Sequence, residues 1–207
     1  MLITCIGDSL TAGHSGPLNE PTPETYQYWL REYLVEHLRS VNHQSIFFNN
    51  FGVGGAVSYR IYQQLDLVDK TDWIIIMGGT NDFWFFSSLS DEEQNQECIN
   101  DVLKNLENTI LSCKKKDIKK IVICSIPPVL VGESANLKMH ENILKANKRI
   151  QKLASNQQII FCDIHLAMRN KKLQMKSKNC MLDGVHFSVD GNRACGYAIG
   201  KTILANI

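Results

Sequence analysis

Three residues in two distant segments have the types and spacing that acyl-transfer chemistry requires. Ser9 ends an apolar run near the N-terminus, and His186 follows Asp183 by three residues in a turn that contains a glycine. A serine hydroxyl is a weak nucleophile at neutral pH and needs an adjacent base. In such a turn the carboxylate can reach one ring nitrogen of the histidine and leave the other for the serine proton. We therefore predict a triad of Ser9, His186 and Asp183.

Two other turns offer hydrogen-bond donors for a negatively charged oxygen. Three of the four residues 52–55 are glycines, and Asn81 follows a strongly apolar run. Acyl transfer passes through a tetrahedral intermediate whose oxyanion needs fixed donors. The candidate donors are the N–H of Gly55, the N–H of Ser9 and the side-chain amide of Asn81.

Apolar runs alternate regularly with helical patterns along the chain. The runs at 1–6, 46–48, 72–77, 121–126 and 159–162 predict five buried strands. Strands that are apolar throughout favour a parallel sheet with helices on both faces. Ligands bind such sheets at the carboxyl ends of the strands, where the four polar turns would meet. We predict one three-layer α/β/α domain over residues 1–207.

Local signals predict where the helices and loops begin. Residues 11–22 are too broken for regular structure and predict a surface loop beside the serine. Thr22 and Pro23 mark the start of a helix, and a weak helix is expected over 59–67. Ser90 opens a capping box before a long amphipathic helix, another helix covers 139–153, and Ser188 caps the last one. Residues 83–86 precede any helix signal.

Composition excludes several classes of protein. The chain has 207 residues, 44% of them hydrophobic, and a net charge of +1, so we expect no nucleic-acid partner. The densest basic segment, 114–120, is expected at a helix end, where cations complement the dipole. No apolar run approaches the ~20 residues of a membrane span. No signal peptide is visible, although a removed leader stays possible. Seven cysteines, three of them in predicted strands, favour reduced core thiols in a cytoplasmic protein.

Together the four turns resemble the four sequence blocks of the SGNH hydrolases, also called GDSL esterases/lipases. The resemblance runs from Ile6 to about Gly191. It implies a flavodoxin-like sandwich with a five-stranded parallel sheet, which agrees with the strand count, and a site that needs no metal or cofactor. It also implies that Gly55, as the second glycine of its pair, is the donor rather than Gly52 or Gly54. Phe187 replaces a proline that is common in the family. The matching segments are Gly7-Asp8-Ser9-Leu10, Gly54-Gly55, Gly79-Thr80-Asn81-Asp82 and Asp183-Gly184-Val185-His186.

The resemblance implies roles for these residues: Ser9 as nucleophile, His186 as base, Asp183 as the acid that orients it, and Gly55 and Asn81 as oxyanion donors. The expected function is hydrolysis of carboxylic esters, such as small acyl esters, acetylated sugars or lysophospholipids, through an acyl-enzyme. The alternatives are acyl transfer to a sugar or lipid hydroxyl, and a flavodoxin-like binding protein without turnover.

Other patterns have competing interpretations. His165 follows the fifth strand and is an alternative base. Two pairs, Asp163 with His165 and Asp183 with His186, could bind a metal ion only together with a third ligand. The sequence shows no convincing third ligand for either pair. Residues 196–202 resemble a phosphate-binding loop that is one residue short. Phe83 and Trp84 either line an acyl pocket or pack onto the core.

Overall fold

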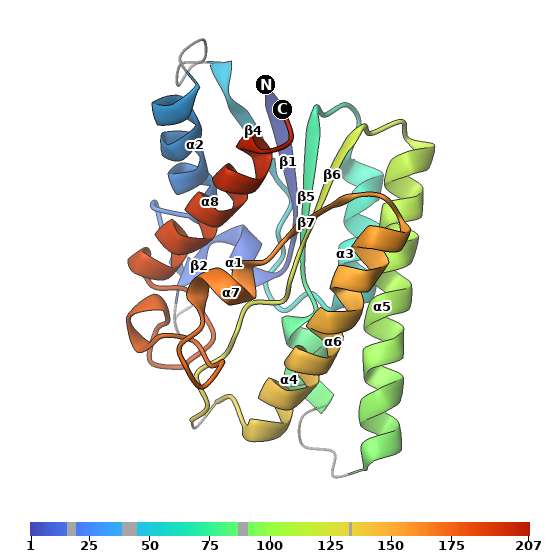
Figure 1. Cartoon of the computed structure of the whole chain (residues 1–207), viewed down its shortest axis with the longest axis vertical. Coiled ribbons are helices and arrows are strands. Elements are labelled where there is room, and N and C mark those ends of the chain that lie inside the picture. The colour runs from blue at the N-terminus through green and yellow to red at the C-terminus, as the bar shows by residue number, and fades with distance from the viewer. Residues whose placement is uncertain (16–19, 39–44, 87–90, 133) are drawn as a thin grey trace.

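A five-stranded parallel sheet forms the centre of the molecule (Figure 1). The computed structural model describes residues 1–15, 20–38, 45–86, 91–132 and 134–207. Its sheet has the order β4-β1-β5-β6-β7, with every neighbouring pair parallel. Within this sheet, β4 lies on one side of β1, and β5, β6 and β7 lie on the other side. This is the flavodoxin-like order. The predicted fold is confirmed. The strands are β1 (Leu2–Gly7), β4 (Phe47–Asn50), β5 (Trp73–Met77), β6 (Lys120–Cys124) and β7 (Ile160–Cys162).

Helices cover both faces of this sheet (Figure 1). One face carries α2 (Tyr26–His37), the short α7 (Ile164–Met168) and α8 (Val189–Leu204), and the other carries α3 (Ser58–Gln63), α5 (Glu92–Lys115) and α6 (Leu137–Asn156). The remaining elements are α1 (Ser9–Ala12), β2 (His14–Ser15), β3 (Glu20–Pro21), α4 (Thr80–Phe86) and the 3₁₀ turns η2 (Gln64–Leu67) and η3 (Ser177–Asn179).

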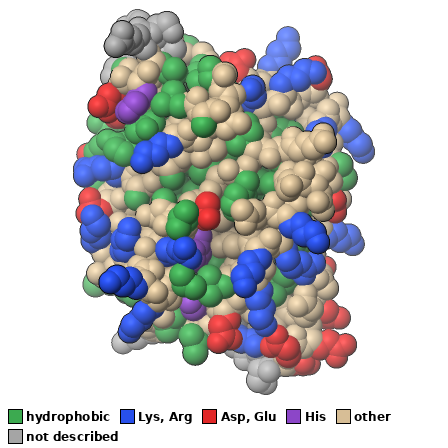
Figure 2. Space-filling view, in the orientation of Figure 1, with side chains coloured by type: hydrophobic (Ala, Val, Ile, Leu, Met, Phe, Trp, Pro, Cys, Tyr) green, Lys and Arg blue, Asp and Glu red, His purple; other side chains and the backbone are tan. Residues whose placement is uncertain are grey.

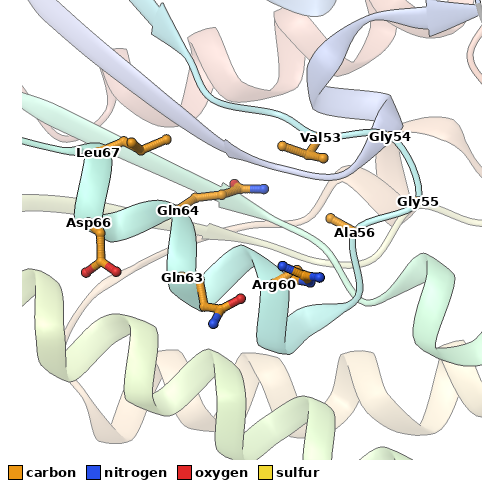
Figure 3. A pocket seen from close by; sticks show the side chains of 9 residues that line it. All are labelled: Val53, Gly54, Gly55, Ala56, Arg60, Gln63, Gln64, Asp66 and Leu67. Atoms are coloured by element: carbon orange, nitrogen blue, oxygen red, sulfur yellow. The ribbon is translucent and has the colours of Figure 1, made fainter.

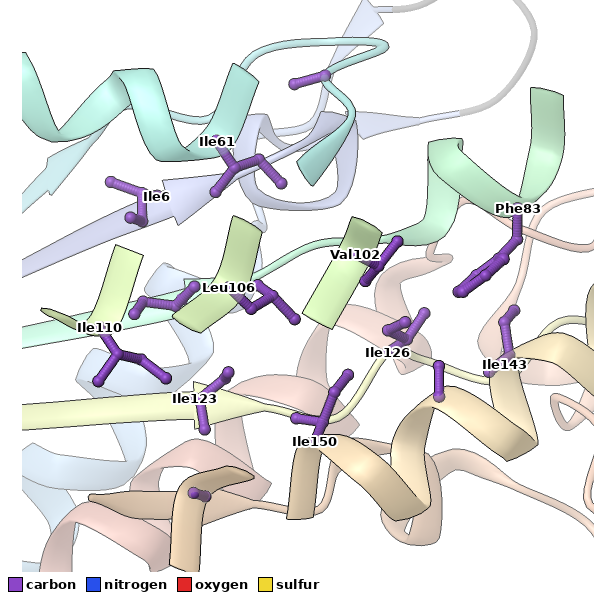
Figure 4. Close-up of a cluster of buried hydrophobic side chains, with 14 of the residues drawn as sticks. Ile6, Ile61, Phe83, Val102, Leu106, Ile110, Ile123, Ile126, Ile143 and Ile150 are labelled. Carbon is purple, nitrogen blue, oxygen red and sulfur yellow. The ribbon is translucent and has the colours of Figure 1, made fainter. Parts of the chain in front are cut away.

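Alternation along the central strands supplies both cores. In β5, Ile74 and Ile76 belong to the cluster beneath α3, α5 and α6 (Figure 4), whereas Ile75 and Met77 belong to the cluster beneath α2 and α8. All of these side chains are fully buried. Successive side chains of a strand point to opposite faces, so a strand buried on both faces must be apolar at every position. This requirement explains why the apolar run at 72–77 predicted a strand correctly.

Close packing of α2 on α8 explains the glycines that resembled a phosphate-binding loop. Gly196 and Gly200 lie inside α8. A Cβ atom on Gly196 would lie 2.5 Å from the Tyr26 carbonyl oxygen, and one on Gly200 would lie 2.4 Å from the Tyr33 ring. The two glycines therefore allow helix–helix contact.

The segment after the first strand differs from the loop predicted for residues 11–22. Its beginning belongs to α1, and β2 then pairs with β3 in a short antiparallel ribbon. The next helix, α2, has Thr25 as its N-cap rather than Thr22. Thr22 instead donates its backbone N–H to the Gly13 carbonyl (2.8 Å), which continues the pairing just beyond the ribbon, and the helix begins later.

The other helix starts are partly confirmed. Ser188 caps α8 by accepting a hydrogen bond from the Gly191 N–H (3.1 Å). At α5 the N-cap is Asp91, whereas Ser90 lies outside the described residues. Residues 80–86, where no helix was expected at 83–86, form α4. An aromatic run has no strong helical signal of its own, and this helix is stabilised by packing rather than by propensity.

The basic side chains are dispersed over the surface, and the cysteines lie in the interior. Lys and Arg side chains are spread over the face drawn in Figure 2, and α5 ends within the basic segment at Lys115. All seven cysteines are buried and unpaired. In the described ranges, no helix combines the length and apolarity needed to cross a bilayer.

Asp8 shapes the turn between β1 and α1. It is the N-cap of α1, and its Oδ1 accepts a hydrogen bond from the Leu10 N–H (2.9 Å). Burial raises the pKa of Asp8 to about 7, although this hydrogen bond opposes the shift. The unfolded chain releases the same proton near pH 4, so the native state binds more protons between about pH 4 and about pH 7. Through that window the free energy of unfolding falls as the pH rises.

We predict that Asp8→Asn removes this pH dependence, because the amide oxygen can still accept from Leu10 but the side chain never ionises. The free energy of unfolding of the variant minus that of the wild type should rise by roughly 1–3 kcal/mol when the pH is raised from 5 to 8. Urea unfolding of both proteins at the two pH values measures this gain. An equal difference between the proteins at both pH values would contradict the ionisation argument.

Candidate active site

Ser9 is held at the junction between a strand and a helix. It is the first residue of α1, directly after Asp8, and is 7% exposed. Its Oγ lies 3.0 Å from Nε2 of His186, although 177 positions separate the two residues in the sequence. This distance is short enough for a hydrogen bond through which the imidazole can take the serine proton.

The turn that carries His186 is built around the Asp183 carboxylate. Oδ2 of Asp183 lies 2.7 Å from Nδ1 of the ring, and Oδ1 accepts from the backbone N–H groups of Val185 (2.9 Å) and His186 (3.0 Å). Burial alone would raise the pKa of Asp183, but these hydrogen bonds outweigh it and hold the pKa below its usual value. An ionised carboxylate on Nδ1 places the ring proton there and leaves Nε2 as the base.

Gly184 makes this turn possible. Its φ is +73°, and a Cβ atom would lie 2.5 Å from the Leu130 carbonyl oxygen. The Leu130 N–H in turn donates to the Gly184 carbonyl (2.8 Å). The Asp183 turn is therefore fixed by the β6–α6 connection as well as by its own hydrogen bonds.

Gly55 and Asn81 come together from neighbouring elements. Gly55 lies in the exposed connection between β4 and α3, with φ +73°, and Asn81 lies in the first turn of α4. The Asn81 amide Nδ2 donates to the Ala56 carbonyl (3.1 Å), and the second amide hydrogen is available for a ligand. Gly52 has a different role, since a Cβ atom there would lie 2.2 Å from the Ala12 backbone nitrogen. The structure thus separates a packing glycine from the candidate donor.

Phe83, one of the two aromatic residues expected near a substrate, lies elsewhere. Phe83 is fully buried in the core drawn in Figure 4, so its assignment to an acyl pocket is corrected to core packing. Trp84 is half-buried and packs against the same cluster. His165, the alternative base, donates its backbone N–H to Ser125 (2.9 Å), and burial lowers its pKa to about 4. Asp163 accepts from the same serine hydroxyl (3.2 Å).

Gln64 is a functional candidate that the sequence did not indicate. Its side-chain amide makes two hydrogen bonds to Gly7, the last residue of β1: Oε1 accepts from the N–H and Nε2 donates to the carbonyl, both at 2.8 Å. Because β4 ends at Asn50, this amide pairs with the backbone of β1 just before Ser9. A single glutamine 57 positions away has no local signal that could have identified it.

A cavity of about 620 Å³ lies behind the Gly55 turn (Figure 3). Gly55 forms part of its wall, but Ser9, Asp183 and His186 do not line it. The cavity therefore adjoins the candidate oxyanion site without being the place where the serine reacts. Its lining is Val53, Gly54, Gly55, Ala56, Arg60, Gln63, Gln64, Asp66 and Leu67.

Comparison with solved structures shows the same fold in several esterases and hydrolases. Axe2, an acetylxylan esterase from Geobacillus stearothermophilus, is 21% identical, with 98% of this chain and 93% of that chain covered and a TM-score of 0.73. A lipase/acylhydrolase from Enterococcus faecalis is 20% identical, with coverages of 99% and 95% and a TM-score of 0.71. LAE5, an alpha/beta hydrolase from the metagenome of Lake Arreo, is 19% identical, with coverages of 99% and 93% and a TM-score of 0.72.

No curated protein matches the sequence significantly. The model of the GDSL-like lipase/acylhydrolase family, in contrast, matches residues 5–194, which include all four polar turns. The chain belongs to the GDSL-like lipase/acylhydrolase family.

Proposed function

We propose that this protein is a serine esterase that hydrolyses carboxylic esters through an acyl-enzyme on Ser9. The observation that carries the proposal is the continuous chain of hydrogen bonds from Ser9 through His186 to Asp183. Serine, imidazole and carboxylate in this order are the parts that acyl transfer needs. The family assignment supports an esterase-type hydrolase, and the acyl-enzyme and the substrate class are our inference.

The geometry supports a two-stage reaction. Ser9 Oγ attacks the ester carbonyl while Nε2 of His186 takes its proton, and Asp183 stabilises the imidazolium that forms. The imidazolium then protonates the alcohol oxygen as the ester C–O bond breaks. In the second stage His186 deprotonates a water molecule, which attacks the acyl-enzyme, and the proton returns to Ser9 as the acid leaves.

Three donors serve the oxyanion in this scheme: the N–H of Ser9, the N–H of Gly55 and the amide of Asn81. Each comes from a different turn, so the negative charge is stabilised only when the turns are held together. Loss of one such donor typically costs about 10²- to 10³-fold in kcat.

Small acyl esters are the substrate class we propose. The Geobacillus neighbour is an acetylxylan esterase, so acetylated saccharides belong in any substrate panel together with lysophospholipids. We also propose a cytoplasmic location, since seven buried and unpaired thiols fit a reducing compartment.

We predict that Ser9→Ala lowers turnover of p-nitrophenyl acetate and butyrate by at least ~10³-fold, because the nucleophile is lost. Ser125→Ala is the matched control: Ser125 is also a buried serine that follows a strand, and its variant should stay within ~3-fold of the wild type. Steady-state kinetics of the three proteins decide the matter.

Equal turnover by the wild type and Ser9→Ala would contradict the esterase proposal. Adding glycerol to the same reaction separates hydrolysis from transfer, since an acyltransferase would form glycerol ester faster than free acid. The esterase proposal requires that free acid predominate.

The remaining proposal for Trp84 concerns acyl-chain preference. If its half-buried ring borders the acyl group, Trp84→Ala should change the ratio of kcat/KM for octanoate over acetate by ~5-fold or more, because even one methylene in an apolar pocket is worth about 1–3 kcal/mol. Phe85→Ala, an exposed neighbour on the same helix, is the control. A parallel fall for every chain length would assign Trp84 to core packing alone.

A further inference from the structure

Asp82 makes two strong hydrogen bonds that no step of the proposed reaction uses. Its Oδ2 accepts from the Ser58 backbone N–H (2.8 Å), and its Oδ1 accepts from the Ser58 hydroxyl (2.7 Å). Asp82 is 7% exposed and Ser58 is fully buried. Both carboxylate oxygens are therefore committed to one residue, the first of α3.

The long helix α5 contributes two further hydrogen bonds to this pair. Asn105 donates its side-chain N–H to the Ser58 hydroxyl oxygen (2.9 Å), and the Cys98 thiol donates to the Asp82 backbone carbonyl (3.7 Å). The helix α5 runs from Glu92 to Lys115, so the start of α3 and the first turn of α4 are both bonded to one long and rigid element. A buried and fully paired network of this kind holds its members in one arrangement.

The pair lies next to two of the three candidate oxyanion donors, Gly55 and Asn81. Asp82 follows Asn81 directly in α4, and Ser58 begins three residues after Gly55. Asn81 also donates to the Ala56 carbonyl (3.1 Å), so the connection after β4 and the start of α4 are joined at two successive points. Gly55 lacks a side chain and has φ +73°, so its orientation depends on such outside contacts.

We propose that Asp82 is a positioning residue that acts through Ser58 to hold the Gly55 turn against Asn81, so that both donors face one oxyanion. Asp82 contacts no reacting atom in this account. The inference rests on the proposed esterase function, and it adds a residue pair to which neither the family resemblance nor the triad assigns a role. A carboxylate suits the position because it accepts two hydrogen bonds, whereas an amide offers only one acceptor oxygen.

A merely structural role predicts a different result. Val57, the N-cap of α3, makes no side-chain capping bond, so Asp82 also stabilises the start of that helix. If capping were its whole purpose, variants would unfold more easily while the folded molecules kept their kcat. A positioning role instead lowers kcat and leaves KM nearly unchanged, because the oxyanion forms only in the transition state.

The test compares Asp82→Asn, Ser58→Ala and the double variant with the wild type. For p-nitrophenyl acetate we expect kcat to fall ~10- to 10²-fold in each, with KM within ~3-fold, since small displacements of catalytic groups cost rates of this size. The double variant should lose no more than the worse single one, because the two residues act as a unit. Kinetics are measured below the onset of thermal unfolding of every variant.

Amide hydrogen exchange of the peptide that covers residues 52–58 gives a readout that is independent of activity. We expect exchange there to be at least ~10-fold faster in Asp82→Asn than in the wild type, because restraining hydrogen bonds are lost. Ser125→Ala is the control, because Ser125 is a buried serine that likewise bonds an aspartate, Asp163. It should lose stability while its kcat and the exchange of residues 52–58 stay at wild-type values.

Two outcomes overturn the proposal: unchanged kcat in the folded Asp82 and Ser58 variants, or unchanged exchange at residues 52–58. If the wild type shows no Ser9-dependent turnover, the esterase proposal fails on its own. The exchange result then still decides whether Asp82 holds the turn.

Discussion

The contact between Ser9 Oγ and His186 Nε2 is the interaction that the arrangement of strands and helices must make possible. The two residues are separated by almost the whole chain, so no local sequence preference can bring them together. Their meeting requires that β1 end at the same rim of the sheet that the turn before α8 reaches. Both the strand order and the packing of α8 on α2 serve this condition. A change in either would move the Ser9 hydroxyl away from the His186 ring.

Three buried or half-buried carboxylates stabilise the turns that carry the chemistry, and they do so in the same manner. Asp8 accepts from the Leu10 N–H beside the serine, Asp82 from the Ser58 N–H after the glycine turn, and Asp183 from the backbone of the histidine turn. A carboxylate that bonds backbone N–H groups fixes the local chain at the cost of burying its charge. Of the three, only Asp183 also contacts a side chain of the proposed triad, His186.

The sequence predicted the sheet well because buried strands have strong local signals, and it also indicated the turn that joins Asp183 to His186; the catalytic roles of these residues stay predictions. A strand buried on both faces must be apolar throughout, which identified 72–77, and the Asp183–His186 spacing is closed by a single turn. The helix starts were predicted less accurately. Thr22 is a suitable residue type for an N-cap, but its backbone N–H donates to Gly13, and Thr25 is the N-cap instead. Phe83 was expected in an acyl pocket but lies in the core, because a sequence cannot show which face of a short helix is buried. Gln64 and Asp82 were missed because their partners are distant in the sequence.

The most direct test of the account is covalent labelling with a fluorophosphonate, followed by mass mapping of the modified peptide. An activated serine beside a preformed base reacts with such a reagent, whereas an ordinary surface serine does not. The account predicts one adduct per chain, located on Ser9, and labelling that slows by orders of magnitude in His186→Ala. An unlabelled protein, or an adduct on another serine, would contradict the claim that Ser9, His186 and Asp183 form a working catalytic triad.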